Sequence, residues 1–540
     1  MSSIAQDDAA VAPGRRTSTH LAELVAALSL ATDLGIGQPM EHALRTCLVA
    51  VEFGRALGAR DEELTEIYDV ALLRRIGCVG DAHEASHLFG DELRVRSEIS
   101  ALDYTGKVDF AGFALRRIGA DRPPLQRLRT VAAALPRLPS GQARSAAAHC
   151  EVARGLADEL GFRPAVIDAL DQLYERWDGS GVPAGVSGRE LRLSARIVPL
   201  VGDAEIFHRL GGLGAAEAMV RRRAGGRYDP ELADAFLRCA GELFDSIEET
   251  PSWGAAIAAE PVSRRYLTES QLDVALTAMA DFVDLKTPVF TGHSRAVAER
   301  ASTAGQAAGL GNARVHLLWR AGLVHDLGRS GVPNSVWEKP GSLTESEWER
   351  VRLHAYLGER MLARVPDLLE VARVAGSHHE RLDGSGYHRG VGSAHLSLEE
   401  RILAAADVRQ ALSEPRPHRR ALDDDEAAAE LRRQVASGRL DGESVALVLT
   451  AGQARRRRRR PWPAGLTARE VEVLALLSTG KTNKQIGRQL FVSPRTVGHH
   501  IQHIYRKLDV STRAAATLFA MQHDLHRQFD PADDQRSVDR

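Results

Sequence analysis

The sequence predicts an all-α protein. Ala, Leu, Arg and Glu dominate the 540 residues and aromatic residues make up only 5% of them, a composition that favours helices. Apolar residues recur at helical spacing from Leu21 to Leu30. Near the C-terminus, Thr467 with Glu470 and Thr482 with Gln485 have the spacing of helix capping boxes. The length is sufficient for two or three domains, each with its own core.

An internal repeat organises the first 450 residues. The stretch Leu173-Tyr-Glu-Arg-Trp-Asp-Gly-Ser-Gly181 matches His378-His-Glu-Arg-Leu-Asp-Gly-Ser-Gly386, and the spacings of the histidines that precede each stretch also agree: His42 to Arg74 corresponds to His293 to His325, and His149 to Leu173 corresponds to His354 to His378. Such self-similarity indicates two copies of one domain. We place them at 19–250 and 268–452, with a linker at 251–267 that contains Pro251, Gly254 and Pro261.

The second copy carries a set of potential metal ligands. His325 and Asp326 end an apolar helical run, where neither residue is favoured unless it is paired or bound to a metal. The same copy contains five further candidates: His293, His354, His378, His379 and Asp407. Five imidazoles and two carboxylates can bind two divalent cations, with Asp326 as the natural bridge between them.

These residues resemble the HD superfamily of metal-dependent phosphohydrolases over residues 268–452. Lys339-Pro-Gly-Ser-Leu-Thr344 and His378 to Tyr387 narrow the resemblance to the HD-GYP subgroup, whose known substrates are cyclic dinucleotides. Two positions depart from that pattern, because Arg329 replaces the usual lysine and His388 replaces the usual proline. Val289 stands where some relatives have a glutamate ligand for a third metal, so we expect two metals.

The resemblance implies a role for each ligand. His293, His325, Asp326 and Asp407 would hold one metal, and Asp326, His354, His378 and His379 would hold the other. Imidazole-rich ligation favours Mn or Fe over Mg. Two cations would neutralise phosphate oxygens and lower the pKa of a water molecule. Asp326 and Arg329 are therefore the candidate catalytic residues, although Arg329 can equally be a surface residue of the loop that follows the motif.

The first copy has lost this ligand set. Arg74-Arg75 stand where His325-Asp326 stand in the second copy, and Leu173-Tyr174 replace the paired histidines. We expect a degenerate domain without a metal site, in which the arginines occupy the vacated space and pair with Asp203. Residues 81–140 form an extra segment, either a sensing insert or a longer surface excursion.

The C-terminal region predicts a helix-turn-helix domain at 466–523. Three short helices with N-terminal capping signals follow one another, and the third, which begins at Pro494, has Val497, Ile501 and Ile504 on one face and polar residues on the other. The region closely resembles the LuxR-type DNA-binding domain, including Thr-Asn-Lys-Gln-Ile486 and Ser-Pro-Arg-Thr-Val497. The candidate DNA-binding residues are Lys484, Ser493, Arg495, Thr496, Gly498, His499, Gln502, Arg506 and Lys507.

The remaining segments read as connections and termini. Residues 1–18 are predicted to be disordered, 453–465 to be an Arg-rich linker with six consecutive arginines, and 524–540 to be a C-terminal tail. No apolar run has membrane-spanning length or the form of a signal peptide, and the four cysteines lack metal-type spacing. We therefore expect a cytoplasmic protein with reduced thiols.

Three functional hypotheses remain open for this sequence. In the first, a homodimeric regulator binds double-stranded DNA and its HD domain hydrolyses a cyclic dinucleotide or another phosphodiester. In the second, the HD domain only senses the nucleotide. In the third, the protein is mainly a phosphohydrolase that its DNA-binding domain localises.

Overall fold

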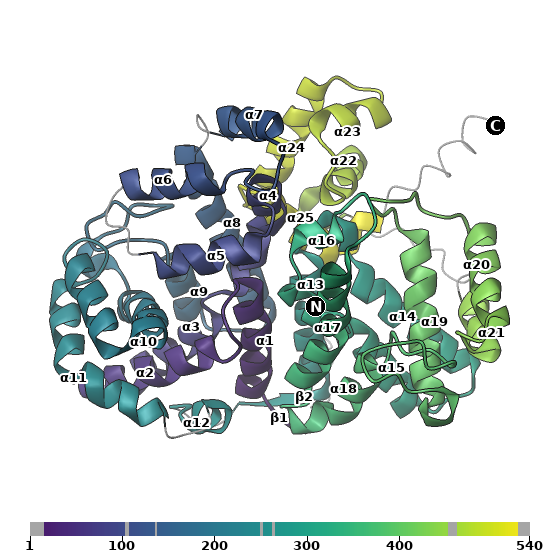
Figure 1. Cartoon of the computed structure of the whole chain (residues 1–540), viewed down its shortest axis with the longest axis horizontal. Coiled ribbons are helices and arrows are strands. Elements are labelled where there is room, and N and C mark those ends of the chain that lie inside the picture. The colour runs from purple at the N-terminus through teal and green to yellow at the C-terminus, as the bar shows by residue number, and fades with distance from the viewer. Residues whose placement is uncertain are drawn as a thin grey trace, which may run out of the picture.

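The computed structural model describes residues 16–102, 107–134, 138–248, 252–261, 265–451 and 462–527. Helices dominate these residues (Figure 1), which confirms the predicted all-α class. Their two strands, β1 (Arg16–His20) and β2 (Tyr266–Thr268), pair antiparallel. None of the described helices has the length and apolar character that crossing a membrane requires.

The first copy is a helical bundle with an insert. The bundle comprises α1 (Leu21–Gly35), α2 (His42–Ala56), α3 (Asp61–Leu73), the short 3-10 helix η1 (Ile76–Asp81), α8 (Leu138–Glu159), α9 (Pro164–Asp171), η3 (Gly188–Glu190), α10 (Leu193–Arg223) and α11 (Pro230–Glu248). The insert comprises α4 (Ala82–Phe89), α5 (Glu92–Ala101), α6 (Lys107–Arg117) and α7 (Pro124–Ala134).

The second copy repeats the bundle. It comprises α13 (Glu269–Asp284), η4 (Pro288–Phe290), α14 (His293–Ala307), α15 (Asn312–Val324), η5 (Leu327–Gly331), α16 (Asn334–Trp337), α17 (Glu345–Leu362), η6 (Pro366–Leu368), α18 (Leu369–Gly376), η7 (Ser393–His395), α19 (Leu398–Ser413), α20 (Asp424–Ala436) and α21 (Gly442–Ala451).

The two copies share one continuous hydrophobic core. Buried residues of both copies form one large cluster, and α1 of the first copy packs against η5 and α17 of the second. The copies lie side by side, with the β1–β2 pair crossing between them (Figure 1). Burial of this apolar surface opposes separation of the copies, so we treat the tandem as one unit.

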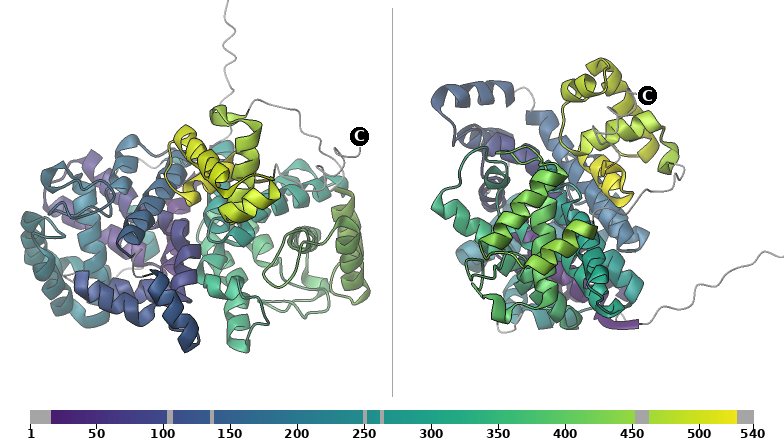
Figure 2. Two further views of the ribbon diagram at one scale, coloured as in Figure 1. Left: turned by 90° about the horizontal axis from the view of Figure 1, so that it is seen from above. Right: turned by 90° about the vertical axis from the view of Figure 1, so that its right-hand side faces the viewer.

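The C-terminal domain has its own small core. It comprises η8 (Pro463–Gly465), α22 (Ala468–Ser478), α23 (Asn483–Gln489), α24 (Pro494–Leu508), α25 (Arg513–Gln522) and η9 (Leu525–Arg527). The capping boxes predicted at Thr467 and Thr482 are present, and the Ser493 side chain accepts a hydrogen bond from the Thr496 amide. The domain lies over the junction of the two copies (Figure 2), and α25 contacts both α8 and α13.

The structure adds order to three predicted connections and termini. Residues 16–18 belong to β1 rather than to a disordered terminus. The predicted linker 251–267 contains α12 (Ser252–Ala258), where Ala256 is buried. Leu525, assigned to the tail, lies in the core of the C-terminal domain. In each case the ordering contacts come from residues distant in sequence, which local composition does not reveal. The expected disorder of 1–15, the arginine run 455–460 and residues 528–540 lie outside the described residues.

The insert contacts the second copy rather than only extending the surface. Glu92 of α5 is fully buried; its carboxylate accepts hydrogen bonds from Lys286 Nζ at 2.8 Å and from the Asn334 amide at 3.0 Å. A buried ion pair with these additional donors fixes the position of α5, because either charge alone would be costly to bury. The four cysteines are free, and three of them are buried.

Candidate metal centre and DNA-binding surface

Seven predicted ligands converge between helices of the second copy. His293 is the first residue of α14, His325 and Asp326 lie between α15 and η5, His354 lies within α17, His378 and His379 follow α18, and Asp407 lies within α19. All are buried except His379, which is partly exposed. Gly328 allows η5 to lie against α17, because a Cβ there would be 2.0 Å from the His354 carbonyl oxygen.

Asp326 lies between two groups of ligands. Its Oδ2 is 2.8 Å from His325 Nε2 and 3.5 Å from His293 Nε2, whereas its Oδ1 is 3.4 Å from His354 Nε2 and 3.6 Å from His378 Nε2. Each carboxylate oxygen therefore faces a different group of imidazoles. This is the arrangement required of a carboxylate that bridges two cations.

Hydrogen bonds at the Nδ1 atoms orient the imidazoles toward the centre. His325 Nδ1 lies 2.8 Å from Gly322 O and His378 Nδ1 lies 2.7 Å from Ala375 O, while His354 Nδ1 contacts Val351 O. Carbonyl oxygens only accept, so these Nδ1 atoms carry hydrogens, and Nε2 is the nitrogen that can offer a lone pair. Fixing the outer nitrogen in this way is typical of histidines that bind metals.

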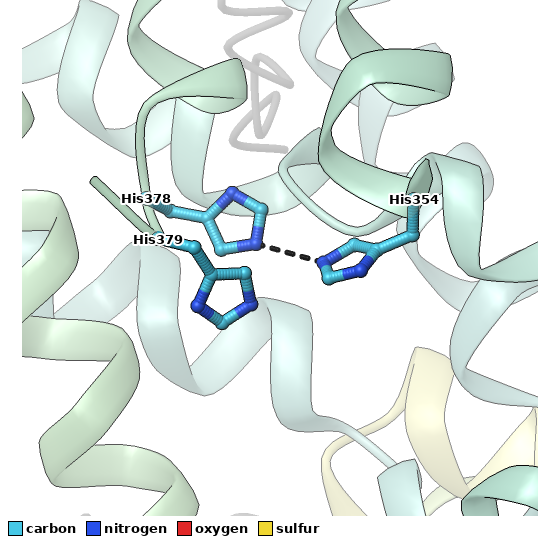
Figure 3. Close-up of side chains that lie close together, drawn as sticks. All are labelled: His354, His378 and His379. Carbon is cyan, nitrogen blue, oxygen red and sulfur yellow. Dashed lines mark hydrogen bonds between the residues drawn. The ribbon is translucent and has the colours of Figure 1, made fainter. Parts of the chain in front are cut away.

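The Nε2 atoms of His354 and His378 lie 3.1 Å apart, as the dashed line in Figure 3 marks. Burial lowers the pKa of His378 to about 4, so its ring is neutral near pH 7. The lone pair of His378 therefore faces His354 across this short gap. Within the described part of the chain, His325 Nε2 and both Asp326 oxygens are buried and form no hydrogen bond of good geometry, although Asp326 Oδ2 lies within ion-pair distance of Arg329 Nη1. Buried nitrogen and oxygen atoms that point toward one centre in this way are suitable ligands for divalent metals.

The charges around the centre are strongly coupled. Burial opposes ionisation of Asp326, but Arg329 and His325 outweigh it and hold the pKa of Asp326 well below its usual range. Burial lowers the pKa of His379 well below its ordinary value. His293 differs, because Glu414 and Asp407 overcome its burial and raise its pKa to about 9. A cation in the centre would replace the proton that His293 otherwise holds.

Arg329 is buried beside the bridging carboxylate. Its side chain is 8% exposed, and Nη1 lies 2.6 Å from Asp326 Oδ2. The guanidinium also lies over the Phe290 ring, 4.0 Å from its centroid, a cation–π contact. The alternative interpretation of Arg329 as a surface residue is therefore wrong. Its position allows it to face an anion bound at the centre.

The polar face of α24 is open to solvent. Five of the predicted DNA-binding residues on this helix are exposed, namely Arg495, His499, Gln502, Arg506 and Lys507, and Lys484 on α23 is also exposed. Ser493 and Thr496 cap the helix and lie at its start. A Cβ at Gly498 would lie 3.7 Å from Asn483 Nδ2, so its helix face is close to α23. Lys507 donates to Glu470 at 2.7 Å and to Gly465 O at 2.8 Å, so two of its three donors are already engaged within the domain.

Comparison with known proteins agrees with both the cluster of candidate metal ligands and the helix-turn-helix domain. The "HD domain" family matches residues 132–232 and 277–444, and the "Bacterial regulatory proteins, luxR family" matches residues 464–520. The 3'3'-cGAMP-specific phosphodiesterase 3 of Vibrio cholerae is 31% identical over 421 residues, which are 76% of this chain and 90% of that protein. The chain belongs to the HD-domain family. It carries two HD domains of the HD-GYP type, the first degenerate, and a LuxR-type domain.

Further relatives and one solved structure extend this comparison. The 3'3'-cGAMP-specific phosphodiesterase 1 of Vibrio cholerae is 38% identical over 32% of this chain and 41% of its own length. The cyclic di-GMP phosphodiesterase response regulator RpfG of Xanthomonas campestris is 38% identical over 27% of this chain and 39% of its own length. The crystal structure of a cyclic GMP-AMP-specific phosphodiesterase of V. cholerae matches with a TM-score of 0.57 and 26% identity, covering 82% of this chain and 99% of the other.

In the first HD domain, ion pairs occupy the place of the metal centre. Arg74 Nη2 lies 2.7 Å from Asp203 Oδ1, as the sequence predicts, and Arg223 and Arg227 each lie 3.1 Å from Asp203 Oδ2. His149 is engaged at both nitrogens, by Asp81 and by Tyr174. Among the described residues, the groups that could hold a metal lie in the second HD domain, apart from one between the two domains that includes His83.

The LuxR-type domain contacts the loop that leads into the metal centre. Thr291 Oγ1 donates to Ser478 O at 3.0 Å, and Arg527 donates to Gly292 O at 3.2 Å. The next residue along the chain is the predicted ligand His293. Phe290, which underlies Arg329, is in the same loop. A change at the metal centre therefore has a direct physical route to the LuxR-type domain.

Several site residues were missed from the sequence. Glu414 lies 2.9 Å from His293 Nδ1 and 2.7 Å from Arg416, which in turn lies over Phe290. The ring of Trp337 packs against those of Phe290 and His354. Glu414 follows Asp407 by seven residues, two turns of helix, and this spacing is the one signal that could have identified it.

Proposed function

We propose that the protein is a DNA-binding transcriptional regulator whose second HD domain binds two divalent metals and hydrolyses a cyclic dinucleotide. The observation that carries this proposal is the bridging position of Asp326, with imidazole Nε2 atoms on both of its sides. The proposed ligand division is the one given by the family resemblance, and Mn or Fe is favoured over Mg because imidazoles predominate.

The chemistry that the chain itself supplies is orientation and charge. Two divalent metals, when bound, supply positive charge for a phosphodiester and a water of lowered pKa. Asp326 holds the negative charge between them, and its burial keeps that charge from being screened by water. Arg329 would exchange its ion pair with Asp326 for the phosphate, with which a guanidinium can form two parallel hydrogen bonds. Phe290 keeps the guanidinium in position during that exchange.

The substrate class follows from the relatives. The V. cholerae proteins are named for 3'3'-cGAMP and the Xanthomonas protein for cyclic di-GMP. Both ligands are cyclic dinucleotides with two phosphodiester groups. We therefore propose this class as substrate.

The test is hydrolysis of 3'3'-cGAMP and cyclic di-GMP by the purified full chain, with metal analysis of the same samples. Asp326→Ala should lose both metal and hydrolysis. Asp425→Ala, which removes an exposed carboxylate of α20, is the matched control and should retain both. Hydrolysis that persists in Asp326→Ala without bound metal would contradict the proposal.

A second candidate function is sensing without turnover, favoured by the contacts between the LuxR-type domain and Gly292. We propose that the protein binds DNA as a homodimer and that nucleotide binding alters its DNA affinity. An effector acts only through its different affinity for two states, typically about 1–3 kcal/mol of coupling.

DNA affinity should therefore be measured with and without nucleotide, in wild type and in His378→Ala. The shift should be about 5–150-fold in wild type and absent in the variant. A shift without hydrolysis would identify a sensor, hydrolysis without a shift would identify an enzyme that its LuxR-type domain localises, and neither would reject both candidates.

A further inference from the structure

A second cluster of metal-type side chains lies between the two HD domains. His83 and His87 are four residues apart on α4 of the insert, which places both imidazoles on one helix face. Glu338 follows α16 of the second HD domain, and α16 packs against α4. One nitrogen or oxygen atom from each of the three residues lies within 4.8 Å of the others. None of them belongs to the metal centre described above.

Glu338 presents one oxygen to each imidazole. Its Oε1 lies 2.8 Å from His83 Nδ1, and its Oε2 lies 3.7 Å from His87 Nε2. A simple hydrogen-bonded pair would need only His83, and 3.7 Å is too long for a hydrogen bond. The second imidazole, whose ring centroid lies 4.5 Å from that of His83, therefore completes a set of three donors around one point.

The carboxylate is itself oriented by the second HD domain. Thr287 Oγ1 donates a hydrogen bond to Glu338 Oε1 at 2.6 Å, and such support is typical of carboxylates that bind metals. Glu338 is mostly buried and His87 is 62% exposed. The cluster therefore has a fixed inner ligand and an outer side through which an ion can enter.

We propose that His83, His87 and Glu338 bind one divalent transition-metal ion, with Zn²⁺ as the preferred ion. Two histidines and one glutamate with an open fourth position are a set that Zn²⁺ accepts in proteins. An ion at about 2.0–2.2 Å from each ligand would replace the hydrogen bond between His83 and Glu338 and draw the exposed His87 closer. Glu84, between the histidines, is exposed, and its charge acts on Arg513 and Tyr505 of the LuxR-type domain. Because Glu84 acts on the LuxR-type domain, we assign no general base to this cluster. The proposal therefore concerns metal binding alone and includes no hydrolysis.

The location would let the ion link the two HD domains, whereas the metal centre lies within the second one alone. The two imidazoles come from the first HD domain and the carboxylate from the second, so the ion would join the degenerate copy to the second one. Thr287 begins the loop that carries Phe290 and leads to His293. An ion here would hold α4 against that loop, and binding to the folded state alone would raise the melting temperature.

The experiment compares zinc content in full-length chains with and without the two imidazoles. Each protein is incubated with Zn²⁺, gel-filtered and analysed for metal, both in the Asp326→Ala background and in the unaltered chain. Adding His83→Ala with His87→Ala should remove one ion per chain in either background. Because the result is a difference of one ion, it does not depend on whether Asp326→Ala empties the other centre. Equal zinc content in the paired proteins would overturn the proposal.

Two further variants guard against a folding artefact. His87→Ala alone removes an exposed side chain. In the Asp326→Ala background, Co²⁺ bound in a four-coordinate site should give visible absorption, and adding His87→Ala should abolish that absorption. His395→Ala, an exposed histidine of the second HD domain, is the matched control and should leave the zinc count and the Co²⁺ spectrum unchanged. An unchanged Co²⁺ spectrum in His87→Ala would overturn the proposal even if the double variant fails to fold.

Discussion

Arg74 and Asp203 form a buried ion pair in the first HD domain, with 2.7 Å between Nη2 and Oδ1. Asp203 lies one residue after the position that matches Asp407 of the second domain, where imidazoles surround the carboxylate. Gly202 provides the space for the guanidinium, because a Cβ there would lie 1.6 Å from Arg74 Nη1. At the offset of 205 residues that relates the two copies, Gly202 stands at the position of Asp407. The first domain has thus replaced a candidate ligand with a glycine that leaves space for a guanidinium.

Asp203→Ala should destabilise the protein by about 3–5 kcal/mol, because it leaves the buried arginines without their counter-ion. Burial opposes ionisation of Asp203, but Arg227, Arg74 and Arg223 outweigh it and hold its pKa well below the usual range. Urea unfolding measures the effect, with the exposed Asp158→Ala of α8 as control. Metal content should stay unchanged, and a loss of metal would contradict the view that this domain has no metal site.

The convergence of the candidate metal ligands was predictable from the sequence, whereas the residues that hold them in place were not. His325 and Asp326 stand out because such residues rarely end an apolar run, and the repeat aligned them with Arg74 and Arg75. Nothing local marks Glu92, whose partners Lys286 and Asn334 are nearly 200 residues or more away. The same holds for β1, since its ordering depends on pairing with β2. The helix starts at Thr467 and Thr482 were correct because capping is a contact over three residues.

Asp326→Ala should remove both ions of the metal centre, whereas His293→Ala should loosen mainly one. The reason is geometric: each oxygen of Asp326 faces a different group of imidazoles, but His293 Nε2 lies on the Oδ2 side alone, 3.5 Å away. Metal analysis after dialysis distinguishes the two variants. Equal losses in both would indicate that Asp326 does not bridge.

Glu414→Gln should weaken metal binding about 10–100-fold, the usual effect of losing an outer hydrogen-bond partner of a ligand. The carboxylate accepts from His293 Nδ1 at 2.9 Å and thereby directs Nε2 toward Asp407. Competition with a chelator measures the affinity. Glu443→Gln, at an exposed position of α21, should bind metal as wild type does; an unaffected affinity in Glu414→Gln would assign Glu414 a role in packing only.

Glu159 should make the stability of the protein depend on pH. Burial and the nearby Asp281 raise the pKa of Glu159 to about 7, against the effects of Gln522 and Arg295. A carboxyl whose pKa is raised on folding favours the folded state in its protonated form. The free energy of unfolding should therefore fall as pH rises from 4.5 to about 7, by at most about 3 kcal/mol.

Because many other groups titrate in this range, the comparison is between wild type and Glu159→Gln. The unfolding free energy of wild type minus that of Glu159→Gln, measured in urea at several pH values, should decrease as pH rises through this window. Glu159 accepts a hydrogen bond from Gln522 Nε2 at 2.9 Å, so the effect concerns the contact between α8 and the LuxR-type domain. A difference that is constant or increases with pH would contradict the assignment.

Gln502 and Lys484 should have distinct effects on DNA binding. Gln502 lies on the exposed face of α24, and a glutamine can form two hydrogen bonds with adenine that discriminate by about 1–3 kcal/mol. Gln502→Ala should therefore relax preference at one base position without changing the salt dependence. Lys484 is exposed on α23 and is expected to contact phosphate. Lys484→Ala should weaken binding to all sequences alike and reduce the salt slope by about 1.

Binding-site selection combined with salt titration measures both effects on the full chain. Arg506→Ala should behave like Lys484→Ala, because its exposed guanidinium is also expected to contact phosphate. Lys507→Ala should differ from both, since Lys507 pairs with the buried Glu470 and its loss should lower the stability of the domain more than its DNA affinity. If Gln502→Ala leaves the sequence preference unaltered while Lys484→Ala changes it, the face of α24 that carries Gln502 is not the one that reads the bases.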